Sequence, residues 1–247
     1  MIRVTMSYQN GLIDVNEDTT NLSNDDKSHP WRRCARGKHF VKEHMLHGTR
    51  KVREHCAFNP SHKEELSYDE IQYITQKYFN NLSGPPTAGI LKFADADIYD
   101  CFIRGWTYFW NDIFKPSNLL DANYIKALIA TESGFRKNPP ENPHAHGLMQ
   151  LLHQSFAALQ NAKGELHDYL IRTPWEKILD PSTNICMGIR WLFQKRYLLA
   201  VRLKREVTWE EVIIEYKSYW DYIKEHDGKM PKGILDLREY YKQLLEG

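Results

Sequence analysis

Apolar residues recur at helical spacing through most of the second half of the chain. Three of them lie at the i, i+3 and i+4 positions that share one helix face: Ile125, Leu128 and Ile129. Glu132 takes the next position on this face. Asp121 is suited to cap the start of the helix, and Gly134 is suited to end it in the left-handed conformation. The pattern predicts a helix whose last turn carries an inward-pointing carboxyl group.

An inward-pointing Glu132 has two interpretations. Burial and the negative end of the helix dipole both favour the neutral carboxyl group, which can then donate a proton near neutral pH. Alternatively, the side-chain stem packs while the carboxylate reaches water or an arginine. Periodicity alone leaves both interpretations open.

The other apolar runs also favour helices. Helices are predicted over residues 67–82, 95–114, 151–159, from 180 onward and after 208. Capping boxes precede two of them, at Ser67-x-x-Glu70 and Thr208-x-x-Glu211. In the run 151–159 we expect Leu152, Phe156 and Leu159 to share one packed face. Since no series of alternating strands appears in this part of the chain, the sequence predicts a mainly α fold.

The composition indicates that the chain has three parts. With 247 residues, 42% of them hydrophobic, the chain can form a sizeable core, and its net charge of +1 excludes a polyanion-binding role for the molecule as a whole. Residues 1–30 are polar and predict a flexible tail. Residues 31–84 form a basic module with one helix. After the Gly-Pro-Pro break, residues 85–247 form the main domain, in which Trp106, Tyr108 and Trp110 are either core residues or sugar-stacking rings.

The basic module contains a short repeat. Trp31 to Cys56 carries eight Lys or Arg against two Glu, and Val41-Lys42-Glu43-His44 is nearly copied at Val52-Arg53-Glu54-His55. Two β-compatible runs around Gly48 predict a hairpin on which His44 and His55 face each other or lie on matching faces. Such a basic surface suits an anionic polymer, such as wall teichoic acid or nucleic acid.

A metal site in this module is the competing hypothesis. Its candidate ligands are Cys34, His39, His44, His47, His55, Cys56 and His62. Their spacing matches no zinc pattern, so a solvated basic surface without metal is the default. The four scattered cysteines of the chain do not suggest a disulfide framework.

Two short motifs follow the central helix. Glu132-Ser133-Gly134-Phe135 and then Gly147-Leu148-Met149-Gln150 resemble the E-S-x-F and G-L-M-Q motifs of the soluble lytic transglycosylase family, relatives of goose-type lysozyme. The resemblance extends over roughly Ile98 to Leu245 and implies a lysozyme-like helical domain. By this resemblance Glu132 is the catalytic residue, Ser133, Met149 and Gln150 line the site, and Gly147 allows close backbone approach. Gly188 would permit close helix packing.

A third motif of the family, A-Y-N-x-G, is matched only in part. The chain reads Glu215-Tyr216-Lys217-Ser218-Tyr219 at the corresponding place. The resemblance implies that Tyr216 contacts substrate and orients Glu132, although a plain core tyrosine is the alternative. Lys217 and Tyr219 replace the Asn and Gly of the motif, which puts the substrate contacts at these two positions in question.

The resemblance implies cleavage of the β-1,4 bond between N-acetylmuramic acid and N-acetylglucosamine of peptidoglycan, with formation of a 1,6-anhydro ring. Glu132 acts first as the acid and then as the base, and neither a metal nor an organic cofactor is required. Two alternatives remain: a goose-lysozyme-like hydrolase with Glu141 as a helper, and a non-catalytic module that binds the cell wall.

The expected substrate lies outside the bacterial cytoplasm. The N-terminal residues show no secretory signal pattern, and no run approaches the ~20 apolar residues of a membrane span. We therefore expect secretion by a route other than Sec, or delivery by a phage.

Overall fold

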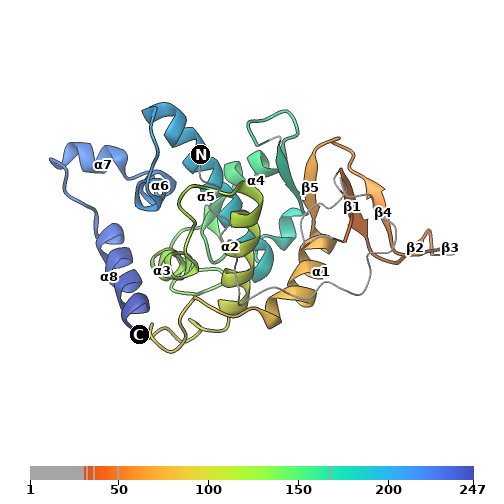
Figure 1. The fold of residues 1–247 in the computed structure, drawn as a ribbon, viewed down its shortest axis with the longest axis horizontal. Helices are drawn as coiled ribbons and strands as arrows, with labels where there is room; N and C mark the ends of the chain where they lie inside the picture. Colours follow the sequence, from red (N-terminus) through yellow and green to blue (C-terminus); the bar gives the residue numbers. More distant parts are fainter. Residues whose placement is uncertain (1–30, 32, 36, 49, 167) are drawn as a thin grey trace, which may run out of the picture.

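A computed structural model describes residues 31, 33–35, 37–48, 50–166 and 168–247, and the predicted tail 1–30 lies outside them. The described residues form eight α-helices: α1 Tyr68–Tyr78, α2 Asp100–Phe114, α3 Ala122–Glu132, α4 His153–Gln160, α5 Pro181–Leu203, α6 Trp209–Tyr216, α7 Trp220–Glu225 and α8 Lys232–Glu246. Two 3-10 helices are η2 Phe79–Asn81 and η3 Trp175–Lys177. The predicted mainly helical fold with small N-terminal hairpins is confirmed (Figure 1).

The part of the chain that the structure describes also contains eight short strands, which pair two by two. The strands are β1 Lys38–Val41, β2 His44–Leu46, β3 Arg50–Val52, β4 His55–Phe58, β5 Glu64–Ser67, β6 Ala145–His146, β7 Leu151–Leu152 and β8 Tyr169–Arg172. The pairs β1–β4, β2–β3 and β6–β7 are antiparallel, and β5–β8 is parallel. In the described part of the chain no helix is both long enough and apolar enough to cross a membrane.

Helix α3 lies at the centre of the helical body, where it packs against α2 and α8 (Figure 1). Asp121 caps its start by accepting from the amide of Asn123 at 2.8 Å, as predicted. The sequence pattern predicts one buried face, but every residue from Ala122 to Ala130 is buried. Even Lys126 is fully buried, because its ammonium group pairs with Asp97 at 2.6 Å and with Asp100 at 2.9 Å.

The aromatic run of α2 forms the core between α2 and α5. Trp106 and Trp110 are fully buried, and their indole N–H groups donate to Ser182 Oγ at 2.8 Å and to the Cys186 carbonyl at 2.9 Å. Buried indoles with satisfied N–H groups are core residues. The core interpretation is therefore confirmed for both residues, whereas the hydroxyl of Tyr108 donates to the Ser83 carbonyl at the edge of the helix.

The predicted helix starts agree with the structure better than some of the predicted ranges. Ser67 and Thr208 cap α1 and α6 with their side chains, as expected, and Asp180 caps α5 in the same way. The helix predicted from residue 95 begins five residues later, after a series of turns. The prediction that Leu152 shares a packed helix face with Phe156 and Leu159 is wrong for Leu152. Leu152 lies in β7 before α4 begins and is exposed, whereas Phe156 and Leu159 are buried.

Strand β5 and helix α1 belong to the same core as the main domain. Leu66, Ile71 and Ile74 are fully buried in that core, and β5 pairs with β8. Helix α1 also contacts the start of α5, where Thr75 Oγ1 lies 2.6 Å from Ser182 Oγ. The boundary at residues 84–85 stays a prediction, and these contacts join its two sides.

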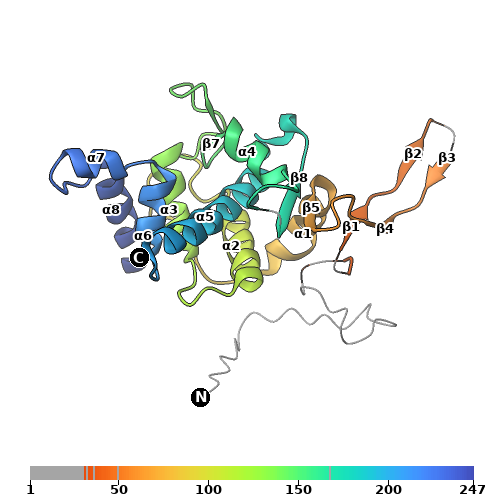
Figure 2. The same cartoon turned by 90° about the horizontal axis from the view of Figure 1, so that it is seen from above.

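The predicted hairpin is present as an arm, defined here as residues 38–48 and 50–58, which extends away from the helical body (Figures 1 and 2). The two copies of the repeat lie antiparallel, so that His44 is opposite Val52 and His55 is opposite Val41. Each histidine therefore faces the valine of the other copy, not the other histidine. In both copies the ring Nδ1 contacts a backbone carbonyl two residues earlier, at 3.0 and 2.9 Å.

A disulfide between Cys34 and Cys56 fastens the base of the arm. The scattered cysteines did not suggest a disulfide framework, and the sequence did not predict this bond. Antiparallel pairing of β4 with β1 returns the chain toward the start of the arm, where Cys56 meets Cys34, 22 positions earlier. The bond also removes two of the candidate metal ligands. Among the described residues no group of three or more His, Cys, Asp or Glu side chains is arranged to hold a metal ion.

Candidate active site

Glu132 is the last residue of α3, and its side chain is 14% exposed. The next residue, Ser133, ends the helix by donating its amide to the Ile129 carbonyl at 3.0 Å. Gly134 and Phe135 then adopt left-handed conformations, with φ of 57° and 64°, and the Phe135 ring is fully buried. Two consecutive left-handed residues turn the chain sharply. The Glu132 side chain therefore stands at the end of a helix that the core holds on all sides.

The nearest charged partner of Glu132 is a residue that breaks the third motif. Lys217 follows the last turn of α6, and its ammonium nitrogen lies 2.6 Å from Glu132 Oε1. The Lys217 side chain is only 6% exposed. The two side chains therefore form an ion pair from which water is mostly excluded. The sequence indicated that position 217 is unusual but did not predict this pair.

Asn184 of α5 holds the segment Gly147–Gln150 in place. Its Oδ1 accepts from the Met149 amide at 2.8 Å, and its Nδ2 donates to the His146 carbonyl at 3.0 Å. Gly147 has φ of 74°, and a Cβ atom there would lie 2.1 Å from Asn184 Nδ2. The close approach of the Asn184 side chain to this backbone therefore requires a glycine at position 147.

Met149 packs directly on α5. The Met149 side chain is fully buried, and a Cβ atom added to Gly188 would lie 2.3 Å from its sulfur. The expectation that Gly188 permits close packing is confirmed. Asn184 and Gly188 lie one turn apart on α5, so a single helix face positions the whole segment.

Tyr216 connects the same segment to α6. Its hydroxyl donates to the Met149 carbonyl at 2.5 Å. Burial, and then the charge of Glu132, raise the pKa of Tyr216 well above its usual range, so the hydroxyl stays protonated. Tyr216 contacts Met149, and the next residue, Lys217, contacts Glu132. The end of α6 thereby brings the two motifs together, while a role of Tyr216 in orienting Glu132 stays a prediction.

The remaining predicted site residues make local bonds. Ser133 is buried, and its hydroxyl donates to the Ile129 carbonyl at 3.3 Å. Gln150 has φ of 49°, and its amide nitrogen donates to the Gly147 carbonyl at 2.9 Å. These bonds shape the two turns that carry the motifs. Substrate contacts by Ser133 and Gln150 stay predictions.

Tyr219, which replaces the last residue of the third motif, is accommodated by α8. A Cβ atom on Gly233 in the first turn of α8 would lie 2.9 Å from the Tyr219 hydroxyl. Burial, and then the charge of Glu132, raise the pKa of Tyr219. The large side chain therefore occupies space left by a glycine on a neighbouring helix, on the side of Glu132.

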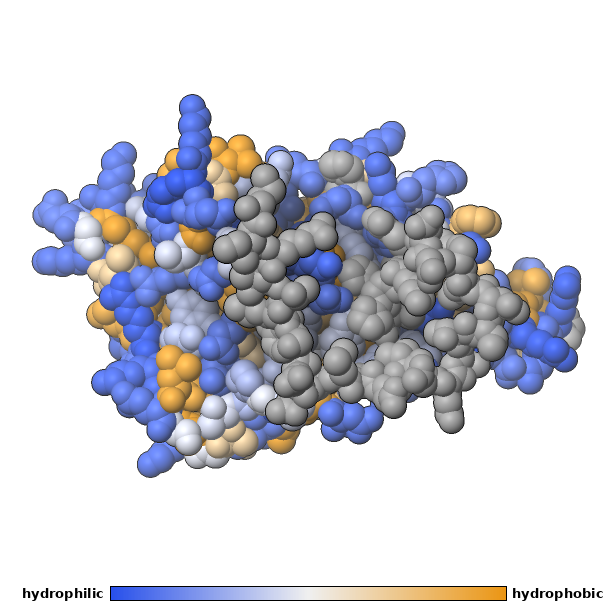
Figure 3. Space-filling model, in the orientation of Figure 1, coloured by the Kyte–Doolittle hydropathy of each residue, from blue (hydrophilic) through white to orange (hydrophobic). Residues whose placement is uncertain are grey.

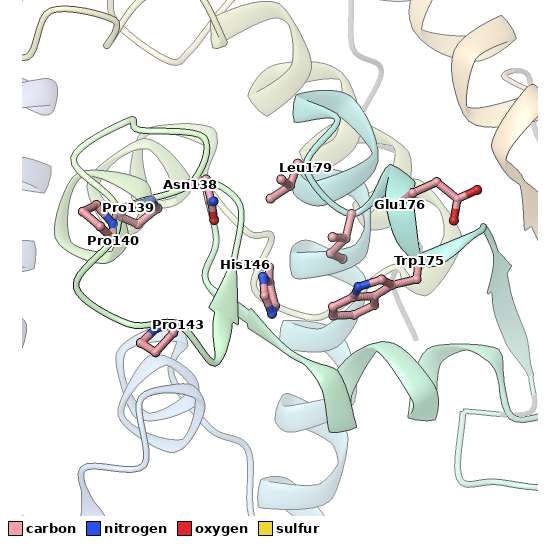
Figure 4. A pocket seen from close by; sticks show the side chains of 9 residues that line it. Asn138, Pro139, Pro140, Pro143, His146, Trp175, Glu176 and Leu179 are labelled. Carbon is pink, nitrogen blue, oxygen red and sulfur yellow. The ribbon is translucent and has the colours of Figure 1, made fainter.

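A cavity of about 350 Å³ lies beside the Gly147–Gln150 segment (Figure 4). The loop with Pro139, Pro140 and Pro143 forms one wall, Trp175 and Leu179 form the other, and His146 points between them. Trp175 is 37% exposed, and its ring stacks on His153 with centroids 4.7 Å apart. Glu132 does not line this cavity. Trp175 is not among the predicted site residues, and its only signal in the sequence is an aromatic residue after a proline between predicted helices.

Residues 115–204 match the family model described as "Transglycosylase SLT domain". The matched range contains Glu132, Ser133, Gly147, Met149 and Gln150, and it ends before Tyr216 and Lys217. No curated protein and no solved structure matches the chain.

Proposed function

Because residues 115–204 form a transglycosylase SLT domain, we propose that this protein is a lytic transglycosylase that cleaves the β-1,4 bond between N-acetylmuramic acid and N-acetylglucosamine in peptidoglycan. The observation that carries the proposal is the end of α6, where consecutive residues contact Met149 and Glu132. This arrangement places one mostly buried carboxyl group beside the second motif.

A single carboxyl group can perform both steps of the proposed reaction. Protonated Glu132 gives its proton to the glycosidic oxygen while the bond from that oxygen to C1 of the muramic residue breaks. The acetamido oxygen of the same residue stabilises the positive charge at C1. Glu132, now a carboxylate, removes the proton of the C6 hydroxyl, and the C6 oxygen bonds to C1. The carboxyl group regains its proton and no water is consumed.

Mass spectrometry of unreduced muropeptides tests this function. Wild-type protein incubated with purified peptidoglycan is expected to release products one water lighter than those of a hydrolase, because the 1,6-anhydro ring forms inside the muramic residue. Products with reducing ends would place the protein among the hydrolases. Intact glycan strands, together with binding to the wall, would indicate a non-catalytic module.

The hydrolase alternative needs a second group to activate water, and Glu141 is its candidate. Arg136 pairs with Glu141 at 2.7 Å, and both side chains are more than half exposed. The Arg136 guanidinium group lowers the pKa of Glu141. The ion pair and the lowered pKa make Glu141 a weaker base for activating water, which favours the one-carboxyl mechanism over a two-carboxyl one.

For the arm we propose binding to an anionic wall polymer rich in phosphodiesters, such as teichoic acid. The arm carries five basic residues against two acidic ones, and it stands clear of the helical body (Figure 2). Exposed apolar side chains lie among these charges, with Met45 at its far end and Phe58 at its base. Figure 3 shows hydrophilic and hydrophobic atoms together at this protruding end. A narrow basic projection suits contact with a flexible polyanion.

Removing positive charge from the arm tests this binding. The triple variant Lys42→Gln, Arg50→Gln, Arg53→Gln is expected to bind several-fold less to wall sacculi that retain teichoic acid, and the loss should shrink at high salt. Cosedimentation with the sacculi measures the bound fraction of each variant. A matched triple variant on exposed lysines of the body, Lys204→Gln, Lys229→Gln and Lys242→Gln, should bind like wild type. The proposal would be contradicted if the arm variant lost as much binding to sacculi stripped of teichoic acid, or if it mainly lost binding to DNA.

We also propose that the protein acts on the cell wall outside the cytoplasm. The substrate class of the proposed reaction lies there, and disulfides such as Cys34–Cys56 persist in oxidising surroundings. Delivery by a route other than Sec, or by a phage, stays a prediction.

A further inference from the structure

The cavity beside the Gly147–Gln150 segment has no part in the proposed reaction, because Glu132 does not line it. Its volume of about 350 Å³ lies within the usual range of ligand pockets, roughly 300–1,000 Å³. His146 joins the cavity to the second motif, since Asn184 binds both the His146 carbonyl and the Met149 amide. A ligand in this cavity would therefore contact the same fixed segment that carries the motif.

Both walls of the cavity are held in place by the protein itself. The three prolines of the loop restrict its backbone, and Arg136 pairs with Glu141 across the same loop at 2.7 Å. On the opposite wall, the Ile178 amide donates to the Trp175 carbonyl at 2.9 Å. The cavity is therefore formed before a ligand binds, which lowers the entropic cost of binding.

Trp175 gives the cavity an aromatic wall (Figure 4). Its side chain is 37% exposed, although three rings hold it. The His153 ring stacks on it, and the rings of His146 and Phe156 lie nearly perpendicular to it, with centroids 4.9 and 4.8 Å away. A partly exposed indole with a fixed orientation offers a flat apolar surface on which the C–H face of a sugar ring can pack.

The charges around the cavity favour a neutral ligand. Among the described residues that line it, none is Lys or Arg and one, Glu176, is acidic. The adjacent Lys177 directs its ammonium group over the Tyr68 ring, 5.1 Å from the ring centroid. Burial, and then two neighbouring histidines, lower the pKa of His146, so its ring stays neutral at neutral pH. Phosphodiesters and peptide carboxylates therefore find no counter-charge, whereas Asn138 and Glu176 can bind hydroxyl and acetamido groups.

We propose that this cavity binds an N-acetylglucosamine residue of the glycan strand, away from the bond that is cleaved. This sugar is uncharged, whereas the muramic residue carries a lactyl group with a free carboxylate or a peptide. The Trp175 indole packs on the sugar ring, and Asn138 and Glu176 bind its polar groups. The inference rests on the proposed function and adds a second contact with the same substrate.

Binding of chitotetraose tests the cavity without turnover, because this neutral oligomer of N-acetylglucosamine lacks the muramic residue at which the proposed reaction cleaves. Isothermal titration calorimetry should show about three- to tenfold weaker binding by Trp175→Ala than by wild type, through loss of the aromatic contact. Trp175→Phe keeps a ring and should recover part of the affinity. Tyr197→Ala is the matched control, because Tyr197 is 63% exposed and does not line the cavity. Equal binding by Trp175→Ala and wild type would overturn the inference.

A second variant keeps the test valid should Trp175→Ala fail to fold. Leu179 lines the cavity and is 37% exposed, so Leu179→Trp should fill the space and weaken chitotetraose binding while Trp175 stays in place. Binding as tight as that of wild type would contradict the proposed site.

NMR locates the bound sugar. The indole N–H signal of Trp175, identified by its absence in Trp175→Phe, should shift as chitotetraose is added, while the signals of the fully buried Trp106 and Trp110 should not. An anionic stem peptide without sugar should leave the Trp175 signal unchanged. A Trp175 signal that does not respond to the sugar, or that responds more to the peptide, would overturn the inference. A wild-type protein that shows the expected shift but forms no product from peptidoglycan would overturn the proposed function and leave the sugar site standing.

Discussion

Glu132→Gln is expected to lower the release of 1,6-anhydro products by at least about 10³-fold, because in the proposed reaction one side chain supplies both the acid and the base. Glutamine is the suitable replacement in this structure. Its amide oxygen can still accept from the Lys217 ammonium group, which is mostly buried and contacts Glu132 at 2.6 Å. Alanine would leave that ammonium group without an acceptor, so loss of activity could be confused with loss of stability.

Quantifying unreduced muropeptides over time measures this effect, and circular dichroism confirms the fold. Glu141→Gln is the matched control, because it removes a carboxylate from the neighbouring loop without touching α3. It should retain wild-type turnover if one carboxyl group is sufficient. Residual anhydro product from Glu132→Gln within tenfold of wild type would exclude Glu132 as the catalytic residue. Strong loss in both variants would favour the two-carboxyl hydrolase.

Lys126→Ala is expected to destabilise the fold by about 3–5 kcal/mol, the usual effect of removing one partner of a buried ion pair. The Lys126 ammonium group donates to Asp97 at 2.6 Å, to Asp100 at 3.0 Å and to the Thr87 carbonyl at 2.9 Å. Without it, the mostly buried Asp100 loses its counter-charge. Lys126 and Glu132 share α3, so the same contacts hold the helix that carries the proposed catalytic residue.

The effect of Lys126→Ala should depend on pH. Burial raises the pKa of Asp100 from 3.8 to about 6, although Lys126 acts to lower it. The folded state thus binds the Asp100 proton more tightly than the unfolded state does, and acid favours the folded state down to the ordinary pKa. The variant should lose more stability at pH 8 than at pH 5.

Urea denaturation at the two pH values measures this loss. Asp100→Asn in the same chain should recover part of it, because the uncompensated charge is then absent. Lys77→Ala, at an exposed position on α1, should change stability by no more than about 0.5 kcal/mol. A loss below 1 kcal/mol for Lys126→Ala would mean that the charges around Asp97 and Asp100 are balanced by water.

Local signals made much of the fold predictable. Side-chain caps and periodic apolar residues are properties of a few neighbouring positions, so the starts of α1, α3, α5 and α6 agree with the structure. The hairpin could be predicted in the same way from β-compatible runs around Gly48. Periodicity does not report how many sides of a helix are covered, and the burial of α3 on all sides therefore could not be predicted.

The candidate site likewise has features that could be predicted from the sequence and features that could not. The sequence by itself determined that Glu132 ends a helix and points inward, and that Gly147 begins a turn requiring a glycine, because both follow from local backbone preferences. The tertiary structure alone decided what these residues contact. Lys217 lies 85 positions from Glu132, and Asn184 lies 35 positions from Met149. Pairs so far apart in the chain meet only when α5 and α6 pack against α3 and its following loop. The contacts of Glu132 are therefore set by that packing and not by its neighbours in sequence.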